Sequence, residues 1–331
     1  MPASDDGLRR VERTRVAGVP TGLGAVVERP HVGQAGRVSS RISRRSALGV
    51  LALVGAGSLG LVEVVRNGGP APKAEAARGT TRLVESYGTH AGEWWVPPRA
   101  VAPGAASSLL PTVVLLHGGY WQPGYDRHLE DAVAADLAAR GQLVWVPDYA
   151  ASDAPWPATL RDAATAFDWV VRGRYADRVD RGRVAVVGHS AGGQLALWLA
   201  SRVRSRAVSP AYAVRPSVVV AQAPVTDLVA AARQHLGGDA VQQLLGGAPS
   251  QVPGRYREAD PVQQLPTGVR TICLHSDTDG IVPISQSEAY VRAATAAGDP
   301  AALIRVPGKH FAHLDPASQA CAQLRRALGL P

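Results

Sequence analysis

The sequence predicts an α/β fold in which helices cover both faces of a mostly parallel β-sheet. Short apolar runs that end in glycine or a polar turn recur along residues 80–331. Such runs are typical of strands buried on both faces of a parallel sheet. Between most of them lie longer segments with alanine and leucine at helical spacing. Regular alternation of strand and helix indicates a parallel sheet joined by crossover helices.

The predicted strands are short, mostly apolar runs. In chain order they are TTRLVESY, GEWWVP, PTVVLLHGG, QLVWVPDY, RVAVV, SVVVAQ, VRTICLH and ALIRVP. The first two are separated only by a short turn, and we expect them to form an opening pair. The other six provide the parallel part of the sheet.

Helices are expected between and after these strands. They are placed at Asp126–Arg140, within PATLRDAATAFDWVVRG, in QLALWLASRV, near Ser285–Ala297 and near Ala317–Ala327. The first stops at Gly141, as expected of a glycine at the C′ position. Residues 225–266 break the alternation with two short helical patterns and glycine-rich joints. We interpret them as a small cap between the sixth and seventh strands of one domain, residues 77–331.

Residues 1–76 are interpreted as a leader that does not belong to this domain. Arg44 and Arg45 precede an uncharged run that reaches Val62, and APKAEA follows. A charged region, an apolar region and a small-x-small site describe an export signal, and the paired arginines resemble a twin-arginine signal. An uncleaved membrane anchor is the alternative, although the uncharged run is short for a span of about 20 residues. We therefore expect an exported protein that meets the membrane only through its leader.

Charge and composition exclude several classes of function. The chain of 331 residues is 46% hydrophobic and carries a net charge of +8, and the leader contributes most of that charge. The domain has no basic block with interleaved aromatic residues, so nucleic acid is not an expected partner. No nucleotide-binding loop, metal cluster or redox pair is present, and no cofactor is expected. Cys273 and Cys321 are predicted as buried thiols, although export would permit a disulfide.

The stretch GHSAGG contains the first candidate catalytic residue, Ser190. It lies between the predicted strand RVAVV and the helix that starts near Gln194. In a strand–turn–helix setting, G-x-S-x-G holds its serine on a sharp turn with the oxygen exposed. Gly188 and Gly192 are required because side chains there would collide as strand and helix approach. The alternative is that Ser190 only caps the helix.

A nucleophilic serine needs a base and an orienting carboxylate, which follow later strands in this kind of sheet. VRTICLHSDTDGIVP provides Asp277 and Asp279, and VPGKHFAHLDP provides His310 and His313. We prefer Asp279, because Asp277 follows its strand so closely that it can cap the turn instead. We prefer His310, with His313 as the alternative base or a solvated residue of the first helical turn. A zinc site of His310, His313 and Asp315 has unsuitable ligand spacing.

An anionic tetrahedral intermediate also requires preorganised N–H donors, which are often the largest catalytic contribution. HGGYW ends the strand PTVVLL, and its glycines give the backbone freedom to form such a site. We assign the oxyanion donors to Gly119, Tyr120 and Ala191, with Gly118 allowing the turn. The alternative is an ordinary glycine turn.

HGGYW, GHSAGG, DTDGIVP and KHFAHLDP, in this order, resemble the α/β-hydrolase fold over about residues 80–331. HGGYW resembles the H-G-G-x-W segment of the kynurenine formamidase and small bacterial esterase (BD-FAE-like) group. PWPATLRD and the stretch from LLGGAP to RYREADPVQQLP are similar to bacterial members of that group. The resemblance implies Ser190 as nucleophile, Asp279 as acid and His310 as base. Ser276 and Lys309 depart from it, because such enzymes usually have glycine there.

The resemblance implies a serine hydrolase that acts on a small-molecule ester through an acyl-enzyme. An arylformamidase that hydrolyses N-formylkynurenine is the alternative, and a non-catalytic binding protein of this fold is disfavoured by the complete set of site residues. A cap of about forty residues is too small to enclose a long acyl chain, which favours a broad carboxylesterase with short acyl groups. The sequence leaves the oligomeric state open.

Overall fold

The computed structural model describes residues 80–101, 108–202 and 213–331. All of them belong to the second of two compact units, which begins at Val65. The predicted leader, residues 1–76, lies outside the described residues. None of the helices in the described ranges has the length and apolar character needed to cross a membrane.

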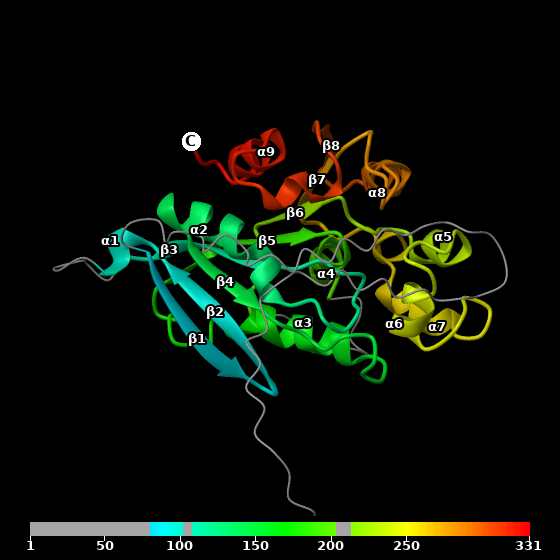
Figure 1. Ribbon diagram of the computed structural model, residues 1–331, viewed down its shortest axis with the longest axis horizontal. Helices are drawn as coiled ribbons and strands as arrows, with labels where there is room; N and C mark the ends of the chain where they lie inside the picture. The colour runs from blue at the N-terminus through cyan, green and yellow to red at the C-terminus, as the bar shows by residue number, and fades with distance from the viewer. Residues whose placement is uncertain (1–79, 102–107, 203–212) are drawn as a thin grey trace, which may run out of the picture. The chain divides into compact units, whose positions relative to one another are not determined.

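An eight-stranded sheet forms the centre of the described unit, in the order β1-β2-β4-β3-β5-β6-β7-β8 (Figure 1). The strands are β1 Thr81–Tyr87, β2 His90–Val96, β3 Leu110–Leu116, β4 Leu143–Pro147, β5 Val179–His189, β6 Val218–Gln222, β7 Arg270–His275 and β8 Ala301–Arg305. β2 runs antiparallel to both β1 and β4, and the other neighbours are parallel. The predicted strands and their mostly parallel arrangement are therefore confirmed.

Helices pack on both faces of this sheet. They are α1 Pro98–Val101, α2 Asp131–Ala139, α3 Ala158–Trp169, α4 Ala191–Ala200, α8 Ser285–Ala296 and α9 Gln319–Ala327, with three more in the cap. Val113 and Leu115 of β3 are buried in one apolar cluster with α2 and α9. Val114 and Leu116 are buried in the other with α3, α4 and α8. Strand residues alternate between the two faces, so one apolar strand supplies both layers.

The predicted helix Asp126–Arg140 is divided in the structure. A 3-10 turn, η1 Arg127–Glu130, precedes α2. The Asp126 side chain accepts a hydrogen bond from the backbone N–H of His128 at 2.9 Å and so caps this turn. Gly141 follows the helix with a φ of +91°, as expected of a glycine at C′.

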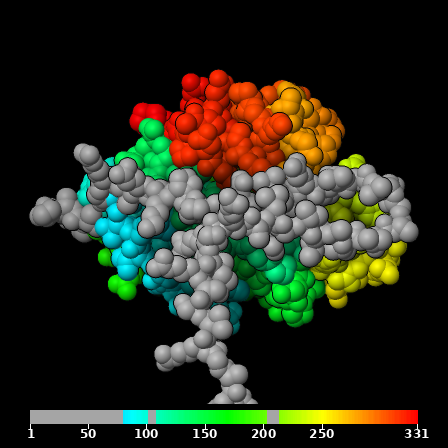
Figure 2. All heavy atoms as spheres, viewed as in Figure 1, coloured from blue at the N-terminus to red at the C-terminus, as the bar shows by residue number. Residues whose placement is uncertain are grey.

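The predicted cap lies between β6 and β7. It contains α5 Leu228–Arg233, α6 Ala240–Leu245, α7 Pro253–Ala259 and the 3-10 helix η2 Pro261–Gln264. The sequence predicted only two helical patterns, because segments this short contain too few turns to show a clear period. The cap contacts the loop after β3, where Gln122 Nε2 donates to Gln243 Oε1 at 2.6 Å. Figure 2 shows the cap in yellow well separated from the first two strands in cyan.

Both cysteines are free and buried, Cys273 in β7 and Cys321 in α9. Burial raises the pKa of each thiol to about 12. The Cys321 thiol donates to the backbone oxygen of His313 at 3.1 Å. The prediction of two buried thiols is confirmed for the described chain.

Candidate active site

Ser190 occupies the sharp turn between β5 and α4. Its φ of 55° and ψ of −117° are strained for a residue with a Cβ, and strain of this kind is concentrated at functional sites. The Ser190 hydroxyl makes no capping hydrogen bond to α4, and only 2% of the residue is exposed. The capping alternative therefore does not hold, and the strand–turn–helix setting is the one expected of a nucleophile elbow. The expectation of an exposed serine oxygen is not met, because the segment after β3 passes directly beside Ser190.

The glycines on either side of Ser190 permit an unusually close approach of three backbone segments. A Cβ at Gly188 would lie 2.1 Å from the backbone oxygen of Gly192. A Cβ at Gly192 would lie 2.1 Å from the backbone oxygen of Leu116, at the end of β3. No side chain can be accommodated at either position while β3, β5 and α4 keep their places.

Asp279 lies in the turn after β7, and its side chain is fully buried. Oδ1 accepts from the backbone N–H groups of Ile281 at 2.8 Å and Val282 at 2.9 Å. Oδ2 lies 2.7 Å from His310 Nδ1 and 3.4 Å from His275 Nε2. Burial opposes ionisation, but the hydrogen bonds from His275 and His310 outweigh it and hold the pKa of Asp279 well below its ordinary value. Asp279 is therefore a fixed anion beside an imidazole.

His310 begins the 3-10 helix η3 His310–Leu314 and is buried. An ionised carboxylate can only accept, so Nδ1 carries the proton in the bond to Asp279 and Nε2 is the basic nitrogen. His189, next to Ser190, donates from Nε2 to the backbone oxygen of His310 at 3.0 Å, and the two ring centroids are 4.6 Å apart. Ser190 Oγ and His310 form no hydrogen bond in the described residues, an arrangement that often tightens only with substrate. The structure thus joins the candidate acid and base directly, and Ser190 lies on the turn next to His189.

The alternative acid and base lie in different environments. Asp277 is exposed and forms an ion pair with Arg305 on β8. His313 is only 1% exposed, and the expectation that it is a solvated residue is wrong. The turn of η3 brings its ring to 5.8 Å from that of His189. Burial and the neighbouring His310 lower the pKa of His313 to about 3, so its imidazole is neutral and has no carboxylate partner.

The HGGYW segment passes directly beside the elbow. A Cβ at Gly118 would lie 3.2 Å from the Cβ of Ser190. Gly119 and Tyr120 have φ values of +112° and +50°, which turn the backbone away from strand geometry. The N–H groups of Gly119, Tyr120 and Ala191 donate to no backbone oxygen within the described ranges. These three donors remain available for an anionic oxygen near Ser190.

Side-chain hydroxyls connect the loops of the site through backbone oxygens. We call the loop after β7, which carries Asp279, the acid loop, and the loop between β8 and His310 the base loop. Ser276 and Thr278 of the acid loop both donate to the backbone oxygen of Gly308 on the base loop, Thr278 at 2.9 Å. The Tyr120 hydroxyl donates to the backbone oxygen of Ile281 at 3.1 Å. The sequence marked Ser276 only as a departure from glycine, and the structure shows what its hydroxyl contacts.

Two buried histidines were missed by the sequence analysis. His189 supports the base loop as described above. His275 Nδ1 lies 2.7 Å from Ser287 Oγ, and its Nε2 lies 2.9 Å from the backbone oxygen of Val282. Because Nε2 must donate to that carbonyl, the Ser287 hydroxyl donates to Nδ1. Each of these histidines is the last residue of a strand, β5 for His189 and β7 for His275, directly before a turn of the candidate site. That position was the available signal in the sequence.

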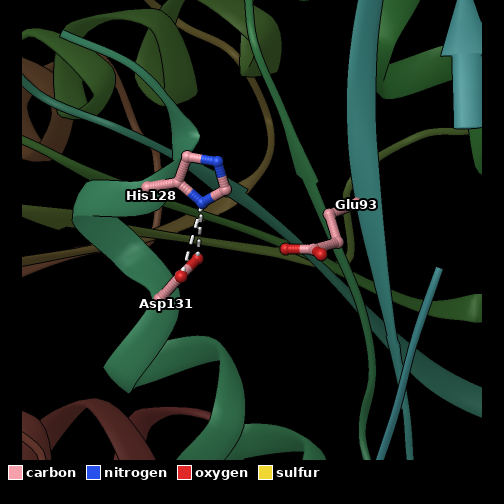
Figure 3. A group of neighbouring side chains, drawn as sticks. All are labelled: Glu93, His128 and Asp131. Atoms are coloured by element: carbon pink, nitrogen blue, oxygen red, sulfur yellow. Dashed lines mark hydrogen bonds and ion pairs between the residues drawn. The ribbon is translucent and has the colours of Figure 1, made fainter. Parts of the chain in front are cut away.

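One group of described side chains, which does not include Ser190, Asp279 or His310, has the composition of a metal site. Ligand atoms of Glu93, His128 and Asp131 lie within 4.8 Å of one another (Figure 3). Arg82 already pairs with both carboxylates, with Nη2 2.7 Å from Glu93 and 3.2 Å from Asp131. The guanidinium therefore supplies the positive charge that a metal ion would bring.

The known proteins to which this chain is similar include several esterases. The BD-FAE family model matches residues 101–293, more than half of the chain. Carboxylesterase NlhH of Mycobacterium tuberculosis is 34% identical over 110 residues, 33% of this chain and 34% of its own length. Esterase LipQ of the same species is 27% identical over 206 residues, 60% of this chain and 48% of its own length. The chain thus spans a third to a half of these curated relatives.

Solved structures of esterases share the fold. The match to a truncated carbohydrate esterase from gut microbiota has a TM-score of 0.64 and 18% identity, and the aligned region covers 77% of this chain and 97% of the esterase chain. The match to a thermostable esterase from Pseudomonas putida ECU1011 has a TM-score of 0.59 and 24% identity, and the aligned region covers 76% of this chain and 82% of the esterase chain. At these identities the likeness shows a common architecture, the α/β-hydrolase fold.

Proposed function

This chain belongs to the BD-FAE family, and we propose on that basis that it is a serine hydrolase that cleaves small carboxylic esters. The observation that carries the proposal is the 2.7 Å hydrogen bond between Asp279 and His310, on loops that meet the Ser190 elbow. An imidazole fixed by a buried anion, beside a strained serine with unpaired N–H groups, is the arrangement that nucleophilic acyl transfer needs.

In this mechanism His310 Nε2 takes the proton of Ser190 as Oγ attacks the ester carbonyl. Asp279 stabilises the resulting imidazolium and keeps the ring in its productive tautomer. The N–H groups of Gly119, Tyr120 and Ala191 bind the oxyanion, each worth about 3–4 kcal/mol. The imidazolium then protonates the leaving alkoxide, and water attacks the acyl-enzyme with His310 again acting as base.

Short acyl groups fit this proposal best. The curated relatives are named as carboxylesterases and esterases, which favours an ester over an amide. The cap consists of short helices, the longest of them seven residues, and offers little length for a long acyl chain. Arylformamidase activity is the second candidate, because the HGGYW segment resembles that of kynurenine formamidases. Export of the mature enzyme remains part of the proposal through the leader sequence.

The test is Ser190→Ala, with the exposed Ser217→Ala as a matched control. Ser190→Ala is expected to lose about 10³-fold or more in kcat on an aryl acetate, to lose labelling by a fluorophosphonate probe, and to keep its thermal unfolding midpoint. Ser217→Ala is expected to keep both activity and labelling. Turnover that survives in an unlabelled Ser190→Ala protein would contradict the proposal. Hydrolysis of N-formylkynurenine at least a hundredfold more efficient than that of the aryl acetate would favour the second candidate.

A further inference from the structure

Exposed apolar side chains are concentrated at the loops of the candidate site. Within the described ranges, the large hydrophobic residues with high exposure are Phe311 at 60%, Val84 at 56%, Leu109 at 55%, Tyr125 at 47% and Ile281 at 37%. Three of the five adjoin residues assigned to catalysis. Apolar surface at such a position is characteristic of a ligand-binding area.

Phe311 and Ile281 are attached to the base and the acid. Phe311 follows His310, and the two rings lie edge to face with centroids 5.3 Å apart at 79°. Ile281 follows Asp279 by two residues, and its backbone N–H holds the Asp279 carboxylate. Its backbone oxygen accepts from Tyr120, so this residue is fixed by two catalytic loops.

Tyr125 is attached to the oxyanion segment. A Cβ at Gly119 would lie 2.3 Å from Cγ of the Tyr125 ring. The ring therefore lies directly on the backbone of a predicted oxyanion donor, and it remains 47% exposed. Each of the three loops that carry the acid, the base and the oxyanion donors thus presents one exposed apolar side chain.

We propose that Phe311, supported by Ile281 and Tyr125, binds the leaving group of the ester and selects esters of apolar alcohols. This inference rests on the proposed function. His310 must deliver its proton to the departing oxygen, so the group attached to that oxygen has to lie beside the His310 imidazole. The Phe311 ring already lies at this imidazole with most of its surface open. As Ser190 Oγ forms the acyl bond, the carbonyl–oxygen bond breaks and the protonated apolar alcohol leaves across Phe311.

The experiment compares 2-naphthyl acetate with phenyl acetate. The two esters share the acyl group, and their leaving groups are aromatic alcohols of similar acidity, so the proton transfers are the same and only the apolar contact differs. Phe311→Ala is expected to lower the ratio of kcat/KM, naphthyl over phenyl, roughly three- to tenfold, since an aromatic pair contributes to that extent. The loss is expected mainly in KM. Phe311→Leu keeps an apolar side chain and is expected to restore part of the ratio.

Leu109→Ala is the matched control, because Leu109 is about as exposed as Phe311 but adjoins no site loop. Its ratio is expected to equal that of the wild type. Equal losses in kcat on both esters in Phe311→Ala, with KM unchanged, would mean that Phe311 only supports His310, and this would overturn the inference while leaving the hydrolase intact. A loss confined to vesicle-bound or emulsified esters would also overturn it, in favour of a lipid-docking surface. Wild type that cleaves neither ester would overturn the proposed function itself.

Discussion

Replacement of Gly192 by alanine is expected to impair both folding and turnover. The added Cβ would lie 2.1 Å from the Leu116 oxygen and 2.4 Å from the His117 oxygen, whereas ordinary contacts begin at 3.4 Å. Both neighbours are backbone atoms where β3 ends, so no rotation of a side chain can relieve the overlap. Either α4 or the segment after β3 has to move by more than 1 Å to restore an ordinary contact.

Two opposing effects set the size of the loss of stability. Alanine is favoured over glycine inside a helix by about 1 kcal/mol, and Gly192 lies in the first turn of α4. Overpacking costs about 1–3 kcal/mol and sometimes more, and an overlap with fixed backbone belongs at the upper end of that range. We expect a net destabilisation of about 1–3 kcal/mol, which lowers Tm by roughly 2–4 °C per kcal/mol in a domain of this size.

Turnover is expected to fall further than stability indicates. The movement displaces either the Ala191 N–H or the HGGYW backbone, and a misplacement of about 1 Å can cost about 10²-fold in rate. The assay measures Tm and kcat on an aryl acetate for Gly192→Ala and two controls. The added Cβ of Gly280→Ala meets no atom within 4 Å, and that of Gly193→Ala meets Pro224 Cβ at 2.9 Å. The losses of Tm and kcat are therefore expected to be largest for Gly192→Ala, smaller for Gly193→Ala and smallest for Gly280→Ala. A Gly192→Ala enzyme with wild-type Tm and kcat would refute the reasoning.

Three further predictions follow from the described contacts and from the leader. Asp279→Asn is expected to lower kcat by about 10³-fold or more because an amide favours the wrong imidazole tautomer; Asp277→Asn, on an exposed side chain, should stay within a few fold. Burial raises the pKa of Glu130 from 4.5 to about 8, and both its oxygens lack a partner. The folded state therefore keeps a proton that the unfolded chain releases, so stability falls as pH rises from about 4.5 to 8, and Glu130→Gln should flatten this decline in urea unfolding at pH 5, 7 and 9. Lysine at both Arg44 and Arg45 is expected to retain the protein inside the cell, and an exported variant in cell fractionation would contradict that expectation.

The turn that carries Ser190 could be predicted because the residues that form it are contiguous in the sequence. The strand, tight turn and helix around Ser190 are contiguous, and each carries its own signal of apolar run, glycine or helical spacing. Asp279 and His310 could be placed for a related reason. Parallel strands end at one edge of the sheet, so residues that follow different strands are brought together. The hydrogen bond between them joins residues 31 positions apart.

The burial of the other polar residues near the site depends on packing between segments that are distant in the sequence. Hydrophobic periodicity within one segment does not predict such packing. His313 looked like a solvated residue of a first turn, yet η3 turns it inward against His189. His275 and Ser287 form a buried pair beside Asp279, although His275 ends a strand and Ser287 lies in a helix. Whether a polar residue in a loop faces water or a neighbouring loop is decided by the tertiary contacts alone.

The two departures from the usual glycines can be explained by the same contacts. Lys309 has a φ of −98° and a ψ of −179°, an extended conformation that any residue adopts. The left-handed turn of the base loop is made one residue earlier, by Gly308 with a φ of +108°. The backbone oxygen of this glycine accepts from Ser276 and Thr278 on the acid loop. A hydroxyl at position 276 thus adds a second hydrogen bond to this oxygen, which a glycine there would leave to Thr278 alone. The orientation of His310 toward Asp279 is therefore supported by the hydroxyls of Ser276 and Thr278 on the backbone oxygen of Gly308, as well as by the hydrogen bond between His310 and Asp279 itself.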